Sequence, residues 1–487
     1  MTGLAQLGGP VACLGLALLL VLPGRRDRIA ALGFAALGTC LLGLAVAPDR
    51  PLVVAGGVCA ALGLGVGLAG LFRPWPWLYP LTALACVPAR IGVHVGDASS
   101  KLLVPLYVVV LGGAILLGWQ LIEGDTRARE LRLACWPLAA FVAWTGLSLA
   151  WSKDVQEGAV QVLAFYIPFT LLALGIARLP WSRLGLRLLY AEITLMALVF
   201  AVVGFYQYET RDIFQNPKVI YANAYAPFFR VNSVFWDPSV YGRFLVLAMA
   251  PSIVLVALGR SLRLSLAAGA ALVVLWLGLL ISYSQSSFAA LLVVVVGAAF
   301  VAWRWRALVA VVLAVAVLAG ISVAQPQVRR SLQHHTSHGL NNLTSDRSSL
   351  VANGIRIAVH HPVTGVGIGG FRRAYAERVG LKGKEPKKAA SHTTPVTVAA
   401  ETGAVGLALF ASLVAALLVQ VFRRRRETLP VVVGLGLLAV FCHALFYNAF
   451  FEDPMTWALM GLAVLALPGA RAAAPPARAE EREAVPV

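Results

Sequence analysis

Charged residues are scarce in this sequence. Only 13% of its 487 residues are Asp, Glu, Lys or Arg, whereas 59% are hydrophobic. Soluble globular proteins carry about 25% charged residues, so the composition excludes that class. Apolar runs close to the roughly 20 residues that cross a bilayer as a helix recur along the chain. We therefore predict an all-α fold, a polytopic bundle of transmembrane helices.

The sequence also lacks a disulfide framework and the common metal-binding motifs. All six cysteines lie within apolar runs, where they are small hydrophobic residues, and neither CxxC nor HExxH occurs. Histidines cluster at residues 334–338 and at His360 and His361, but no carboxylate or cysteine shares their spacing. We predict neither a metal site nor a cofactor.

The apolar runs predict about 12 to 15 transmembrane spans. The predicted spans are residues 6–22, 29–47, 51–71, 76–93, 101–121, 132–151, 157–178, 186–206, 239–259, 264–282, 286–303, 307–324, 396–421, 429–450 and 455–469. Short arginine-rich loops mark the cytoplasmic side, and examples lie around Arg25, Arg127 and Arg183. The two longer loops, 208–238 and 325–395, then face outward.

This topology divides the chain into four predicted parts. Residues 1–324 form a transmembrane bundle with the outer loop 208–238, and residues 325–395 form a large, partly helical extracytoplasmic loop domain. Residues 396–469 form the C-terminal transmembrane helices. The cytoplasmic tail 470–487 is rich in Ala, Pro and charge, which is typical of a disordered segment.

The loop 325–395 is basic and contains a glycine-rich stretch. It carries 11 of the 40 Lys and Arg residues, which indicates an anionic partner, and its outward position excludes nucleic acid. The stretch GVGIGG, residues 365–370, matches G-x-G-x-x-G, but no strand precedes it, so we reject a dinucleotide site. Two interpretations remain open. Its backbone amides, beside Arg372, receive a phosphate oxygen, or the stretch is a tight turn between two helices.

One histidine of this loop stands directly before the next apolar run, in SHTTPV. Thr394 is predicted to cap a helix that starts at Pro395, so His392 lies just ahead of a helix N-terminus at the outer face. The partial positive charge there disfavours an imidazolium and attracts anions. A neutral base beside an anion site suits glycosyl transfer from a phosphate leaving group. These residues by themselves leave a purely structural role open.

The first outer loop contributes arginines and aromatic residues. Arg243 falls inside a predicted span, where an arginine is costly and therefore functional by default, and the arginine fork suits phosphate oxygens. The alternatives are an ion pair of Arg243 with Asp237 or Glu452, and snorkelling of Arg230 to the interface. The aromatic residues, including Trp236, are typical of a wall against lipid or sugar.

The combined pattern resembles the O-antigen ligase and O-antigen polymerase family of bacterial membrane glycosyltransferases. In that family a histidine and a small polar residue are followed by nine residues, a glycine, two residues and a glycine. His392, Thr393, Gly403 and Gly406 match this pattern, although Thr393 stands where Asn, Ser or Gln is usual. Further similar stretches are residues 151–154, 230–238, 345–347 and 361–371. The resemblance covers roughly residues 130 to 450.

The resemblance implies a metal-independent, inverting transfer at the outer face of the bacterial cytoplasmic membrane. A glycan carried on a polyprenyl diphosphate, such as undecaprenyl diphosphate, is moved to an acceptor hydroxyl. By the same resemblance, His392 is the base or orients the acceptor, and Arg230 binds the diphosphate.

The chain departs from the family at one position. Family members often have a Ser-Arg pair where this chain has YSQSSF, so Gln285 replaces a cation. The candidates to supply that charge are Arg243, Arg347, Arg356 and Arg372. Arg347 and Arg356 are nine positions apart on their predicted helix and so point in opposite directions. We expect Gln285 and Trp236 to line the wall of the donor or acceptor site.

Several functions remain open from the sequence. A ligase passes the glycan to a lipid or protein acceptor, whereas a polymerase of the same family passes it to another lipid-linked repeat. A transporter or flippase is the alternative from another class, but we find no internal repeat of the kind such proteins often show. An enzyme with a catalytic carboxylate pair in its first outer loop is disfavoured, because Asp49 and Asp97 each stand alone.

Overall fold

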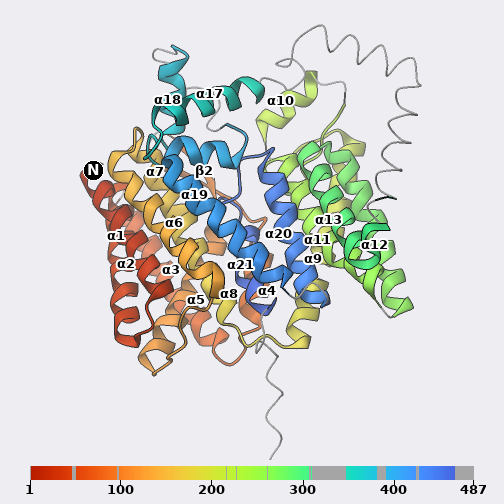
Figure 1. Ribbon diagram of the computed structural model, residues 1–487, viewed down its shortest axis with the longest axis horizontal. Helices are drawn as coiled ribbons and strands as arrows, with labels where there is room; N and C mark the ends of the chain where they lie inside the picture. The colour runs from red at the N-terminus through yellow and green to blue at the C-terminus, as the bar shows by residue number, and fades with distance from the viewer. Residues whose placement is uncertain are drawn as a thin grey trace, which may run out of the picture.

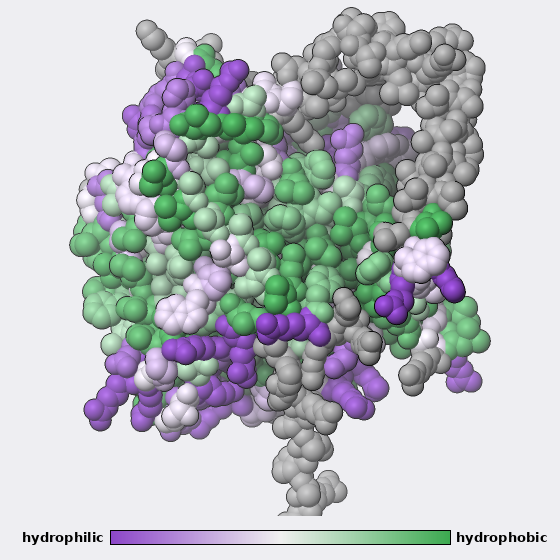
Figure 2. All heavy atoms as spheres, in the orientation of Figure 1, coloured by the Kyte–Doolittle hydropathy of each residue, from purple (hydrophilic) through white to green (hydrophobic). Residues whose placement is uncertain are grey.

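The structure is a bundle of long apolar helices (Figure 1). The computed structural model describes residues 2–46, 51–95, 98–214, 216–225, 228–259, 261–306, 309, 347–380, 391–423 and 427–466. Within these residues, eleven helices are long and apolar enough to cross a membrane, and two further apolar helices are shorter. Hydrophobic side chains form a belt across the middle of the visible face, with hydrophilic ones above and below it (Figure 2). The predicted all-α, polytopic transmembrane bundle is confirmed.

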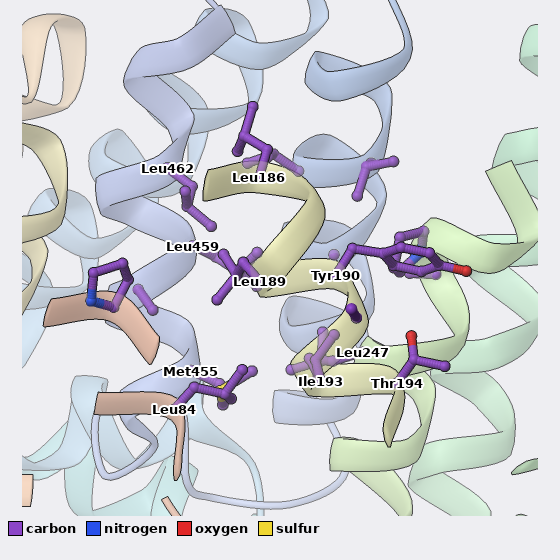
Figure 3. A pocket seen from close by; sticks show the side chains of 18 of the residues that line it. Leu84, Leu186, Leu189, Tyr190, Ile193, Thr194, Leu247, Met455, Leu459 and Leu462 are labelled. Atoms are coloured by element: carbon purple, nitrogen blue, oxygen red, sulfur yellow. The ribbon is translucent and has the colours of Figure 1, made fainter. Parts of the chain in front are cut away.

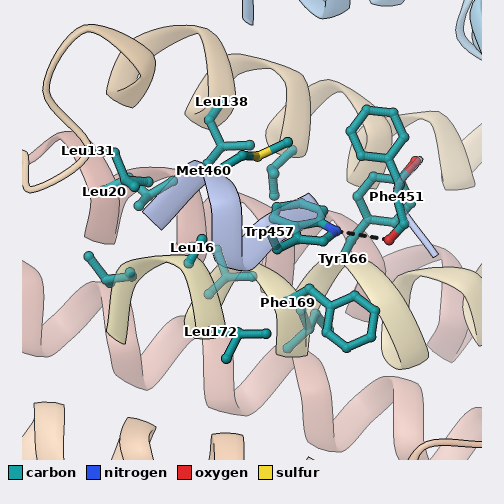
Figure 4. Packing of buried hydrophobic residues seen from close by; sticks show 14 of the residues in the cluster. Leu16, Leu20, Leu131, Leu138, Tyr166, Phe169, Leu172, Phe451, Trp457 and Met460 are labelled. Carbon is teal, nitrogen blue, oxygen red and sulfur yellow. Dashed lines mark hydrogen bonds between the residues drawn. The ribbon is translucent and has the colours of Figure 1, made fainter. Parts of the chain in front are cut away.

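The larger hydrophobic core joins the N-terminal helices to three C-terminal ones. Its helices are α1 (Thr2–Val21), α2 (Arg25–Val46), α3 (Pro51–Phe72), α4 (Leu78–Ala85), α5 (Val104–Ile122), α6 (Cys135–Ser148), α7 (Val155–Gln161), α8 (Ile167–Arg178), α19 (Thr394–Phe422), α20 (Thr428–Ala444) and α21 (Pro454–Leu462). Trp457 of α21 is fully buried and donates its indole N–H to the carbonyl of Phe451 at 2.9 Å (Figure 4). Tyr166 packs edge-on against the Trp457 ring, so α21 is anchored against the α7–α8 segment.

A second core and a cap complete the molecule. The second core is built from α9 (Arg183–Thr210), α11 (Pro238–Leu258), α12 (Leu262–Ser282), α13 (Gln285–Trp303) and α20 (Thr428–Ala444). Three short helices, α10 (Pro217–Tyr225), α17 (Arg347–His360) and α18 (Phe371–Arg378), lie at one end of the bundle, the top in Figure 1, which we call the site end. The opposite end carries Arg25, Arg73 and Arg127, and we call it the arginine end.

One predicted span is wrong. Residues 76–93 form the short helix α4 (Leu78–Ala85), and the chain then enters a hairpin of β1 (Ile91–Val95) and β2 (Ala98–Leu102). Pro88 lacks the N–H that a continuing helix needs, so the apolar run ends far short of a bilayer crossing. The predicted span 307–324 apart from Val309, the histidines of 334–338 and the tail 470–487 lie outside the described residues.

Buried ion pairs hold the arginine end together. Arg28 is 1% exposed and binds Glu130 at 2.9 Å. Arg178 pairs with the same Glu130 carboxylate, and its second ion pair, with Asp125, has a distance of 2.7 Å. Burial acts to raise the pKa of Asp125, but its hydrogen bonds to Arg127 and the charge of Arg178 hold that pKa at about 2. This folded-state value lies below that of an unfolded Asp. Asp125 therefore adds stability above about pH 4, and this stability is lost as the pH falls towards 2.

We expect Glu130→Gln to destabilise the fold by about 3–5 kcal/mol, because it leaves two buried guanidinium groups without their shared carboxylate. Denaturant unfolding of the purified protein in detergent measures the loss. Glu123→Gln is the matched control, since Glu123 pairs with Arg73 at an exposed position and such pairs contribute about 1 kcal/mol or less. Equal losses in the two variants would contradict a structural role for the buried network.

Candidate active site

His392 has a left-handed backbone conformation, with φ at 63°. This conformation costs a residue with a side chain about 1–2 kcal/mol, so the surroundings must impose it. The fully buried Ser391 holds the turn in this conformation. Its hydroxyl donates to the carbonyl of Thr393 at 2.8 Å and lies 2.9 Å from the hydroxyl of Thr397. The half-buried imidazole is thus carried by a strained turn, as is common at functional sites.

The start of α19 differs by one residue from the prediction. The N-cap is Thr393, not Thr394, and its side chain makes no capping hydrogen bond. The N–H of Thr393 donates instead to the hydroxyl of Ser391 at 3.3 Å, and Thr394 Oγ1 is buried without a hydrogen-bond partner in the described chain. His392 still stands immediately before the N-terminus of a 29-residue helix.

The first of the two motif glycines makes a kink in α19. Gly403 adopts φ 68° and ψ −168°, a conformation that only glycine reaches readily, and a Cβ there would lie 2.1 Å from the carbonyl oxygen of Val363. The N–H of Ala404 donates to the carbonyl of Pro362 at 2.8 Å. Gly403 therefore lets the segment around residues 362–364 dock at the kink. Gly406 lies one turn further on, where a Cβ would lie 1.9 Å from Thr402 Oγ1.

The GVGIGG stretch is a packed turn. The N–H groups of Val366 and Gly367 donate to the carbonyls of Ala400 and Glu401 at 2.9 and 2.8 Å, and that of Ile368 donates to the hydroxyl of Ser148 at 3.1 Å. These amides therefore bind protein acceptors. This observation favours the tight-turn interpretation over a phosphate cradle.

The same turn also binds residues 151–154 and a carboxylate that the sequence analysis missed. The N–H of Lys153 donates to the carbonyl of Val366 at 3.0 Å, and the hydroxyl of Ser152 donates to the carbonyl of Ile368 at 2.7 Å. Glu401, within α19, is buried and accepts the N–H of Phe371 at 3.3 Å. Glu401 was overlooked because it stands in an apolar run. A carboxylate inside such a run was the available signal.

Arg230 lies against the turn between α12 and α13. Its N–H donates to Asn223 Oδ1 at 3.0 Å, and its carbonyl accepts Asn223 Nδ2 at 2.9 Å. Its Nε donates to the carbonyl of Ser282 at 3.2 Å. The exposed Gln285 is the first residue of α13, three positions after Ser282. The fold therefore brings Arg230 to the turn where the expected cation is replaced by an amide.

Arg243 is 4% exposed and pairs with Asp453, with Nε 2.9 Å from Oδ2. Both predicted partners are wrong. Asp237 caps α11 by accepting the N–H of Ser239 at 2.7 Å. Glu452 is solvent-accessible, yet protein atoms surround its carboxyl. That loss of hydration, reinforced by Glu157, raises its pKa to about 7, although Arg243 and Arg90 act to lower it.

A buried polar cluster lies between Arg230 and Arg243. Its members are Ser239, Ser282, Ser284, Ser286, Ser287 and His443. His443 Nε2 lies 3.0 Å from the hydroxyl of Ser286 and 3.2 Å from the carbonyl of Ser239. The hydroxyl of Ser284 lies 3.3 Å from that of Ser286, and the N–H of Ser284 donates to the hydroxyl of Ser282 at 3.3 Å. Ser282 accepts Arg230, and Ser239 is one helical turn from Arg243, so the cluster connects the two arginines.

The other predicted cations are spread over the cap. α17 packs against α19 through Leu350, Gly354 and Ile357, whereas Arg356 is exposed. Arg372 is half-buried in the first turn of α18. Arg347 begins α17, and its side chain is outside the described part of the structure.

The predicted wall residue Trp236 is half-buried, and its carbonyl accepts Asn216 Nδ2 at 2.7 Å. Among the described residues, no group of three or more His, Cys, Asp or Glu side chains is arranged to hold a metal ion.

Comparison with known proteins finds a similarity to one family. Residues 270–411 match the sequence profile of O-antigen ligase. No curated protein matches the chain. The matched region runs from α12 into α19 and includes Gln285, His392 and the two motif glycines, whereas Arg230 and Arg243 precede it. The resemblance predicted from the sequence is confirmed, because residues 270–411 of this chain match the O-antigen ligase family.

Proposed function

We propose that this protein transfers a glycan from a polyprenyl diphosphate to an acceptor hydroxyl, in an inverting reaction that needs no metal ion. The match to the O-antigen ligase family supports a membrane enzyme of glycan transfer. The observation that carries the finer proposal is the strained turn that presents His392 directly before the N-terminus of α19. The donor is a lipid-linked glycan, and the acceptor is a glycan, lipid or protein that bears a free hydroxyl.

In the proposed reaction, His392 takes the proton of the acceptor hydroxyl. The acceptor oxygen attacks the anomeric carbon from the side opposite the diphosphate, and the bond between that carbon and the diphosphate oxygen breaks. The configuration inverts because the displacement is single. The N-terminus of α19 disfavours a charged imidazole, which keeps the ring able to accept the proton. The guanidinium of Arg230 stabilises the charge that develops on the departing diphosphate.

We assign the site end to the outside of the bacterial cytoplasmic membrane. Arg25, Arg73 and Arg127 gather at the opposite end of the bundle, and positively charged short loops remain cytoplasmic. A donor whose glycan projects outward then meets His392 and Arg230 at the same face.

We expect Arg230→Ala to weaken donor binding by about 10- to 100-fold, because a charge-assisted hydrogen bond contributes about 1.5–3 kcal/mol. Binding of a polyprenyl-diphosphate glycan to the protein in nanodiscs measures the effect. Arg211→Ala is the control from the same loop, since the exposed Arg211 stacks on Tyr208 and Phe229. Unchanged donor affinity in Arg230→Ala would remove Arg230 from the donor site.

The function itself is tested with purified protein, a polyprenyl-diphosphate glycan and candidate acceptors, with and without a chelator. We expect release of polyprenyl diphosphate that depends on the acceptor and survives chelation. Product formed from the lipid-linked repeat alone indicates a polymerase, and product formed only with a separate lipid or protein acceptor indicates a ligase. Absence of any transfer, together with movement of the lipid-linked glycan across a vesicle membrane, would replace the proposal with a transporter.

A further inference from the structure

A large apolar cavity lies inside the bundle, between α9, α11, α12 and α20 on one side and α4, α8 and α21 on the other. Its volume is about 1020 Å³. Leu189 and Ile193 of α9, Leu84 of α4, Leu247 of α11 and Met455 of α21 point into it (Figure 3). The only charged side chain among its described lining residues is Arg187, near the arginine end. A lining of this kind accepts a hydrocarbon chain and disfavours a soluble anion.

Polar residues stand where this cavity approaches the site end. Arg90 follows the lining residue Val87 by three positions, and Tyr107 directly follows Leu106. On the other side, Glu452 is two positions before Pro454 and Arg243 is one turn before Leu247, both of which line the cavity. Arg90 lies within electrostatic range of the Tyr107 hydroxyl and of the Glu452 carboxyl. These residues, from four separate segments, therefore form one polar group at the end of the cavity.

Arg90 differs from the buried arginines described above. Arg28, Arg178 and Arg243 each bind a carboxylate, whereas no ion pair to Arg90 is present in the described chain. Its Nε, like that of Arg178, is buried without a hydrogen-bond partner, although the side chain as a whole is partly exposed. Glu452 is the acidic group within electrostatic range of Arg90, but the two form no ion pair in the described chain. Unlike Arg178, Arg90 therefore has no carboxylate that balances its charge, which points to an anionic ligand.

We propose that Arg90 and this cavity together bind the lipid carrier of the donor, with its phosphate on Arg90 and its hydrocarbon chain in the cavity. This inference rests on the proposed function. It assigns to Arg90 the positive charge that Gln285 does not provide. Arg243, which like Arg90 lies within electrostatic range of Glu452, is connected to Arg230 by the polar cluster. A lipid phosphate at Arg90 therefore lies on a polar route to the turn between α12 and α13.

The phosphate-binding part of the proposed site is tested with Arg90→Gln and Arg90→Lys. The probe is geranylgeranyl diphosphate, and geranylgeraniol is its uncharged counterpart. Native mass spectrometry or equilibrium binding in detergent supplies the affinities. We expect Arg90→Gln to weaken binding of the diphosphate about 10- to 100-fold and to leave the alcohol unaffected, whereas Arg90→Lys retains most of the affinity. Unchanged binding by Arg90→Gln overturns the proposal. A larger loss in Arg187→Gln also overturns it, because the phosphate then lies at the arginine end.

The binding of the hydrocarbon chain in the cavity is tested by substituting two neighbouring alanines of α12. Ala271 lines the cavity, whereas Ala270 is exposed and does not. We expect Ala271→Phe to weaken binding of geranylgeranyl diphosphate several-fold but not that of inorganic diphosphate, and Ala270→Phe to change neither. Equal behaviour of the two variants overturns the assignment of the cavity.

Direct binding separates this inference from the proposed function. If Arg90→Gln binds the prenyl diphosphate like the unaltered protein while glycan transfer proceeds, only the inference fails. If the Arg90 and Ala271 variants lose affinity as expected but the unaltered protein transfers no glycan, the lipid site stands and the proposed reaction fails.

Discussion

Substitution of His392 is expected to lower the rate of glycan transfer by about 100- to 10,000-fold, the usual contribution of a general base. The acceptor hydroxyl then has no group to take its proton, whereas the donor still meets Arg230. His392→Asn is the sharper variant, because asparagine tolerates the left-handed backbone that this position requires. Transfer rates under saturating donor, with donor affinity measured separately, distinguish loss of chemistry from loss of binding.

The matched control for His392 is His360→Ala, which removes an exposed histidine from α17 at the same end of the bundle. It is expected to leave transfer unchanged. Thermal unfolding of His392→Asn should match that of the unaltered protein, since the turn is held by Ser391 and Thr397. Transfer at the ordinary rate by folded His392→Asn would refute the assignment of the base.

Substitution of Gly403 by alanine is expected to be the most damaging single change to the fold near the site. The backbone there occupies a region that costs a residue with a side chain about 1–3 kcal/mol, and overpacking adds about 1–3 kcal/mol. The new methyl group would lie 2.1 Å from the carbonyl oxygen of Val363, so the docked segment must move. We expect a destabilisation of about 2–6 kcal/mol, together with loss of transfer, measured by denaturant unfolding and by the transfer assay.

Gly269→Ala provides the comparison for this variant. Gly269 is a helical glycine of α12, and no atom lies within 4 Å of the position of an added Cβ. Alanine there is expected to be neutral or slightly stabilising, because it has the higher helix propensity. If Gly403→Ala is as stable and active as Gly269→Ala, the kink in α19 does not position the site.

Most of the transmembrane architecture was predictable because it depends on local chemistry. A helix that crosses a bilayer must satisfy its own backbone hydrogen bonds and present apolar side chains over about 20 residues, so its signal is continuous in the sequence. The exception is residues 76–93, where the apolar run suggested a span and Pro88 ended the helix. The hairpin that follows has no strong strand pattern, and pairing between β1 and β2 decides its structure.

The candidate site was predictable only in part. The position of His392 before a helix depends on neighbours within a few residues, and so do the motif glycines. The partner of Arg243 does not, because Asp453 is distant in the sequence and reaches Arg243 only when the tertiary structure brings the loop before α21 to α11. Arg90 carried no signal at all, since a lone arginine beside an apolar run is usually an interfacial anchor.

The sequence by itself determined that this protein is a polytopic membrane protein, that it resembles the O-antigen ligase family over residues 270–411, and that a histidine stands ahead of a late helix. Tertiary structure alone decided which arginines bind carboxylates, that Arg90 has no ion pair among the described residues, and where an apolar cavity lies near it. The physical reason is range. Hydropathy and helix capping act between residues close in the chain, whereas ion pairs and cavities arise only where distant segments pack together.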